Sequence, residues 1–188
     1  TYGVGVDQKF SPEWYAGIQF FARDLDVPFS QVDMDGNFST AEDDWKEDVG
    51  TIYLYWAPCN WVAIGLDYYY EKYERELFGG PEGIREQTTH RFTPHLNFFH
   101  RSGISGGVRA NYIDQEGEFG FSPFYTDGSD RFWIVDVSLR YRLPKRYGIM
   151  RLEIRNLFDE QFSYLDTDPA ASRYMSERQI LASLTVSF

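Results

Sequence analysis

The chain of 188 residues is rich in aromatic side chains and carries a strongly negative charge. Aromatic residues make up 19% of it, 16 glycines and 8 prolines punctuate it, and the net charge is −11 at pH 7. This composition favours an all-β protein over a helix bundle. No stretch approaches the roughly 18 to 20 consecutive apolar residues that a membrane helix requires, so a helical membrane protein is excluded. A nucleic-acid partner is not expected, because phosphate binding depends on clustered Lys and Arg.

Alternation of apolar and polar side chains with a period of two predicts nine strands and almost no helix. In the strand expected at about 62–71, Val62, Ile64 and Leu66 share one face, while Asp67 and Glu71 share the other. In chain order the strands are expected at about 1–10, 14–25, 49–57, 62–71, 87–100, 103–115, 132–143, 150–155 and 179–188.

The connections between these strands alternate in length. Short turns are expected at 11–13, 57–60, 101–103 and 144–148, and long polar loops at about 26–48, 74–86, 116–130 and 160–176. A chain that runs up and down with short turns at one rim and long loops at the other is typical of an outer-membrane barrel. The predicted fold is therefore all-β, an antiparallel up-and-down transmembrane β-barrel.

The two faces of the strands distinguish a membrane barrel from a soluble one. A soluble barrel fills its interior with apolar side chains. Here the face opposite the apolar stripe carries many charged residues, which would be costly to bury in a dry core. We therefore expect the apolar face to contact lipid and the charged face to line a wet lumen. The candidate lumen-facing residues are Arg91, His95, Arg109, Asp136, Arg140, Arg151, Glu153 and Arg155.

Aromatic residues gather near the strand ends, as expected of two interfacial girdles. One group lies near the short turns and comprises Trp14, Trp56, Trp61 and Phe188. The other lies nearer the long loops and comprises Tyr68, Tyr70, Tyr112 and Trp133.

The odd number of strands predicts an incomplete barrel. Complete bacterial barrels of this type have an even number of strands, and open strand edges in lipid leave backbone groups unsatisfied. Residues 1–188 are therefore expected to form a single barrel segment without a plug domain. That segment is either the C-terminal part of a larger barrel or a small barrel that lacks at least one strand.

From about residue 90 onward, the sequence resembles the last strands of TonB-dependent outer-membrane receptors. Three segments carry this resemblance. Phe92–His95 looks like a recurrent strand opening of that family, and Phe132–Tyr141 is similar to its penultimate hairpin. Arg155–Tyr164 is close to its Asn-Leu-Phe-Asp-x-x-Tyr motif, with Phe162 at the Tyr position. The chain ends in Leu184–Phe188, whose alternate apolar residues and terminal aromatic look like the signal read by the barrel-assembly machinery. Ser176-Glu177-Arg178 replaces the Gly-Arg that usually precedes the final strand.

The resemblance implies a transport or receptor protein of the Gram-negative outer membrane that passes or binds a solute. Its implied partners are the lipid bilayer with its lipopolysaccharide, the barrel-assembly machinery acting on Phe188, and the TonB system through an N-terminal part outside this sequence. The alternative is a structural or export barrel with a periplasmic helical-repeat domain, which would show a repeat of about 34 residues upstream.

The acidic segment 31–42 has two interpretations. It matches a twelve-residue calcium loop at several positions, with Asp33, Asp35 and Glu42 as candidate ligands, but Gln31 stands where the first carboxylate belongs. A solvated acidic loop is the favoured interpretation, and calcium is the only cofactor that the sequence suggests.

Other candidate chemistry is weaker. His90, His95 and His100 alternate between faces at their spacing of five, so they are not expected to converge on one metal ion. The lumen arginines either select an anionic solute or pair with neighbouring carboxylates and brace the wall, and we favour bracing. No nucleophile beside a base, phosphate loop or catalytic carboxylate pair is recognisable, so an enzyme is not predicted.

Overall fold

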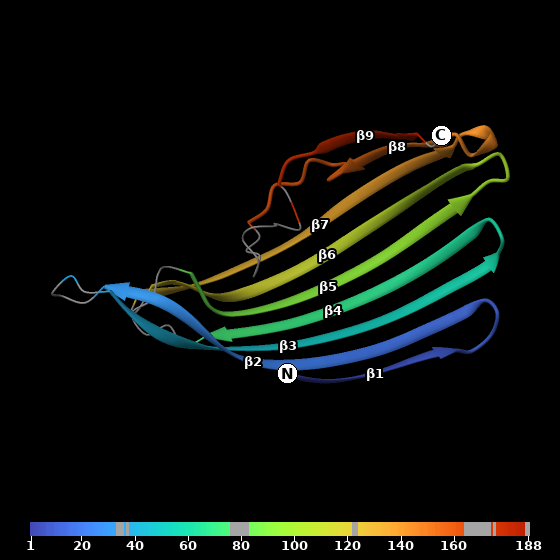
Figure 1. The fold of residues 1–188 in the computed structure, drawn as a ribbon. Coiled ribbons are helices and arrows are strands. Elements are labelled where there is room, and N and C mark those ends of the chain that lie inside the picture. The colour runs from blue at the N-terminus through green and yellow to red at the C-terminus, as the bar shows by residue number, and fades with distance from the viewer. Residues whose placement is uncertain are drawn as a thin grey trace.

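The computed structural model describes residues 1–32, 36, 38–75, 83–121, 124–163, 174 and 176–186. They form one antiparallel sheet of nine strands in which each strand pairs with its sequence neighbours (Figure 1). The strands are β1 (Tyr2–Lys9), β2 (Trp14–Val32), β3 (Phe38–Cys59), β4 (Val62–Arg75), β5 (Gly83–Phe99), β6 (Ile104–Phe121), β7 (Phe124–Arg142), β8 (Gly148–Arg155) and β9 (Gln179–Val186), with a short 3-10 turn, η1 (Pro144–Arg146), between β7 and β8. The prediction of an all-β antiparallel sheet is confirmed. Within the described residues β1 and β9 do not pair with each other, so the sheet is curved but not closed.

The predicted short turns lie together at one end of the sheet. The β1–β2, β3–β4, β5–β6 and β7–β8 connections are short and lie at the same end of the sheet (Figure 1). Among the described residues, no helix is long and apolar enough to cross a bilayer.

Two of the predicted long loops are wrong, because the flanking strands continue through them. The β2–β3 hairpin stays paired as far as Val32 and Phe38, although a loop was expected at 26–48. The β6–β7 hairpin stays paired as far as Phe121 and Phe124, although a loop was expected at 116–130. Asp, Glu, Gly and Pro residues, which have low strand propensity, are frequent in both segments and obscure the alternation. The β6 extension is joined to β5 by an ion pair between Glu118 and Arg85 at 2.7 Å. Residues 76–82 and most of 160–176 lie outside the described part of the chain.

The register aligns the apolar residues of successive strands into one band, on what we call the apolar face. One register row crosses β2 to β9 through Trp14, Trp56, Ile64, Leu96, Val108, Val137, Ile154 and Ile180. A second row, towards the long hairpins, crosses β2 to β7 through Ile18, Ile52, Tyr68, Phe92, Tyr112 and Trp133. Four residues further along the strands, the row consists of Ala22, Asp48, Lys72, Thr88, Glu116 and Ser129. Apart from Ala22 on β2, this row is polar or charged, so the band ends at nearly the same level on five neighbouring strands, β3 to β7.

The opposite face, here the polar face, holds most of the buried side chains. Its apolar centre is formed by Ile113, Phe132 and Ile134, against which Phe162 and Tyr174 from the β8–β9 connection pack. The rings of Phe132 and Phe162 stack at a centroid distance of 4.2 Å. The connection after β8 thus returns over the polar face.

We predict that Gly65→Ala destabilises the sheet through the polar face. A Cβ at Gly65 would lie 2.1 Å from Nε2 of His95 and 2.8 Å from Cδ1 of Tyr55, so the aromatic neighbours must shift. Overpacking of this kind costs about 1–3 kcal/mol. The matched control is Gly50→Ala, whose new Cβ would meet no atom closer than 3.8 Å. Guanidinium titration followed by tryptophan fluorescence measures both, and equal free energies of unfolding would contradict the packing at Gly65.

Candidate functional site

A hollow of about 580 Å³ opens on the polar face, within the ~300–1,000 Å³ range of small-molecule sites. Strands β3 to β9 contribute to its lining, together with Tyr174 from the β8–β9 connection. Of the eight residues singled out from the sequence, those that line it are Arg91, Arg109, Asp136, Glu153 and Arg155. His95, Arg140 and Arg151 lie on the same face but outside the lining.

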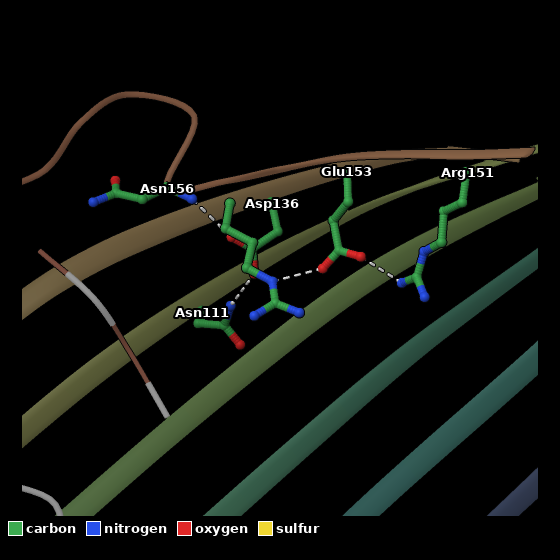
Figure 2. A network of polar contacts seen from close by, with 6 residues as sticks. Asn111, Asp136, Arg151, Glu153 and Asn156 are labelled. Carbon is green, nitrogen blue, oxygen red and sulfur yellow. Dashed lines mark hydrogen bonds and ion pairs between the residues drawn. The ribbon is translucent and has the colours of Figure 1, made fainter. Parts of the chain in front are cut away.

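Glu153 on β8 links two of these arginines (Figure 2). Its carboxylate forms an ion pair with Nη2 of Arg151 at 2.6 Å and accepts a hydrogen bond from Nε of Arg155 at 2.7 Å. Glu153 lies between these two arginines on the same strand, and the charge-assisted hydrogen bond from Arg155 is its strongest contact. These two arginines therefore pair with a carboxylate, but within their own strand and not across neighbouring strands as the favoured sequence interpretation expected.

Asp136 on β7 anchors the start of the β8–β9 connection (Figure 2). Its Oδ1 accepts from the backbone N–H of Asn156 at 3.0 Å, and its Oδ2 accepts from Nδ2 of Asn111 at 3.5 Å. Asn156 has a positive φ of 51° and exchanges two hydrogen bonds with the backbone of Glu160, at 2.8 and 2.9 Å. This pinned turn is the structure that the Asn-Leu-Phe-Asp segment adopts.

A second carboxylate, Asp67 on β4, is occupied by two neighbours. Its Oδ1 accepts from the hydroxyl of Tyr55 at 2.8 Å, and its Oδ2 lies 3.3 Å from Nδ1 of His95. Both contacts cross to adjacent strands, so they stabilise the local register.

Arg91 on β5 makes contacts with aromatic residues. Its guanidinium lies 4.5 Å from the ring centroid of Tyr69, in cation–π geometry, and donates to the hydroxyl of Tyr174 at 3.3 Å. Arg91 thereby ties the β8–β9 connection to the centre of the sheet. Tyr174 was not predicted as a site residue, because its partner Arg91 lies 83 positions away in the sequence.

Arg109 on β6 differs from these arginines. Among the residues that the structure describes, its guanidinium forms no hydrogen bond or ion pair, although it faces the hollow. Its cross-strand neighbour Asp136 is turned to Asn156 and Asn111 instead. The bracing interpretation therefore does not describe Arg109.

The predicted calcium ligands are only partly described. Asp33 and Asp35 lie outside the described residues, and so does the proposed assembly signal Phe188. Glu42 is exposed and lies in strand β3, paired with Pro28, so it is not in a loop. Among the described residues, no group of three or more His, Cys, Asp and Glu is placed to hold a metal ion. The three histidines are separated as expected, with His95 on the polar face, His90 on the apolar face beside Tyr68, and His100 at a turn.

Two groups on β4, beyond the apolar band, have raised pKa values. The hydrogen bond to Glu74, whose Oε1 is 2.5 Å away, raises the pKa of Lys72. Burial raises the pKa of Tyr73 to about 12. Both groups therefore keep their ordinary protonation state at neutral pH.

Comparison with protein-family models, curated proteins and solved structures found no match.

We predict that Asn156→Ala loosens the β8–β9 connection. The change removes both side-chain hydrogen bonds to Glu160 and places alanine at a positive φ, at a cost of about 1–3 kcal/mol. Limited trypsin digestion with mass spectrometry should show faster cleavage between β8 and β9. Asn156→Gly removes the same hydrogen bonds without the φ penalty, so it should show an intermediate rate. Cleavage at the wild-type rate in both variants would show that Asn156 does not pin this turn.

Proposed function

We propose that the nine strands form part of the wall of a transmembrane β-barrel in the outer membrane of a Gram-negative bacterium. In this proposal the apolar face contacts lipid, the polar face lines the lumen, and the protein binds or passes a solute. The two free edges within the described residues require further strands for closure, because unsatisfied backbone groups are costly in hydrocarbon.

The observation that carries the proposal is the level at which the apolar band ends. On five neighbouring strands, β3 to β7, side chains on the apolar face change from apolar to polar or charged along one register row, and aromatic residues mark the border. Tyr112 and Trp133 pack there at a centroid distance of 5.0 Å, while Trp14 and Trp56 stack at 5.2 Å near the short turns. A soluble sheet has no reason to align such a border across its strands, whereas a bilayer interface requires it.

The height of the band fits the same proposal. On β7 the segment Trp133–Tyr141 carries apolar residues at every second position. At about 3.3 Å per residue this segment is roughly 26 Å long. Its number of residues lies at the lower end of the roughly 9–11 that a tilted strand needs to cross a bilayer. Exposed apolar surface of this extent on a soluble protein would cause association.

The receptor class is proposed on the resemblance to TonB-dependent receptors, with the pinned turn at Asn156 as the structural counterpart of its most specific motif. The proposed partners are the bilayer with its lipopolysaccharide, the barrel-assembly machinery and the TonB system.

Arginine substitutions on the two faces of β7 test this proposal. Leu139 lies on the apolar face and is 52% exposed, whereas its neighbour Ser138 lies on the polar face opposite Glu153. An arginine near the bilayer midplane costs about 2–4 kcal/mol. In cells that express the full-length protein, Leu139→Arg should reduce the folded, heat-modifiable form in outer-membrane fractions several-fold more than Ser138→Arg. Equal loss in both variants, or greater loss with Ser138→Arg, would reverse the assignment of the faces.

A further inference from the structure

The hollow on the polar face contains one guanidinium that is available to a ligand. Arg109 lines the hollow and forms no hydrogen bond or ion pair with any described residue. Arginine presents five donors in a planar fork, which matches the paired oxygens of a carboxylate or phosphate group.

The carboxylates around Arg109 are already committed to other donors. Glu153 accepts from two arginines of its own strand, and Asp136 accepts from Asn156 and Asn111. The lining of the hollow as a whole carries three arginines, Arg91, Arg109 and Arg155, against four carboxylates, Asp67, Asp136, Glu153 and Glu177. Recognition of an oxyanion therefore depends on the donor fork of Arg109 and not on an excess of positive charge.

The rest of the lining supplies neutral hydrogen-bonding groups. Thr51, Thr93, Tyr53 and Tyr55 line the same hollow. The hydroxyls of Thr93, Tyr53 and Tyr55 already donate to Asn111, Asp7 and Asp67, and their oxygens can still accept hydrogen bonds from a hydroxylated body attached to the anionic group.

We propose that the hollow binds the oxyanion of a small hydroxylated solute through Arg109. The carboxylate and the phosphate of such a solute share the chemistry that the guanidinium recognises. This inference rests on the proposed function, because it gives the chemical class of the solute that the barrel binds.

The test measures binding of three related sugars to the purified full-length protein in detergent, by isothermal titration calorimetry. Glucuronate carries a carboxylate, glucose 6-phosphate carries a phosphate, and glucose carries neither. We expect saturable binding of at least one anionic sugar at least tenfold tighter than that of glucose, and the comparison of the two identifies which oxyanion is preferred.

Arg109→Gln should weaken binding of the preferred sugar at least tenfold, while Arg109→Lys, which keeps the charge but loses the fork, should weaken it less. Arg142→Gln is the matched control, because Arg142 lies on the polar face of β7 but outside the lining of the hollow. That control should bind within twofold of wild type. If neither anionic sugar binds better than glucose, or if Arg109→Gln binds like wild type, the inference is wrong.

Membrane fractionation of the same variants distinguishes a failure of the proposed solute class from a failure of the proposed outer-membrane function. Heat-modifiable protein in the outer membrane that fails to bind either anion contradicts the solute class alone. Absence of wild-type protein from the outer membrane contradicts the proposed function instead.

Discussion

The cross-strand register is the constraint on which the structure depends. A slip of one residue between any two strands moves every side chain of a strand to the opposite face. In this sheet such a slip would place Asp67 or Asp136 in the apolar band and move Leu66 or Val137 to the polar face. Eight successive pairings hold the apolar residues on one face, with register shifts only between Trp56 and Cys59 and between Ile84 and Glu86 in the described strands.

On the polar face, hydrogen bonds and ion pairs also hold the strands in register. A charged face can curve inward only if its charges are paired, because an unpaired buried charge carries a large desolvation cost. Glu153 satisfies this condition with its two arginines, and the carboxylate of Asp67 accepts a hydrogen bond from the hydroxyl of Tyr55. Arg109 does not satisfy this condition, because its guanidinium is not paired with a described residue. It lies in the hollow where we propose that a solute is bound.

The sequence predicted the nine strands and their faces because a period of two is visible wherever one face is apolar and the other polar. It failed at the tips of the β2–β3 and β6–β7 hairpins, where residues of low strand propensity (Asp, Glu, Gly and Pro) are frequent and obscure the period. It also predicted which charged residues share the polar face. It did not predict that Arg155 pairs with Glu153 while Arg109 stays unpaired, since that depends on how each carboxylate is turned. Nor did it predict the contacts of Phe162 and Tyr174 with β5 and β7, which depend on the path of the β8–β9 connection.

Cysteine scanning along β7 tests the assignment of the two faces most directly. Single cysteines at each position from Trp133 to Tyr141, in a Cys59→Ser background of the full-length protein, are exposed in intact outer membranes to a water-soluble maleimide. The account predicts labelling with a period of two, in which the polar-face positions such as Ser138 react faster and the apolar-face positions such as Val137 and Leu139 are protected. Uniform labelling, or faster labelling at Val137 and Leu139 than at Ser138, would contradict a lipid-facing apolar band.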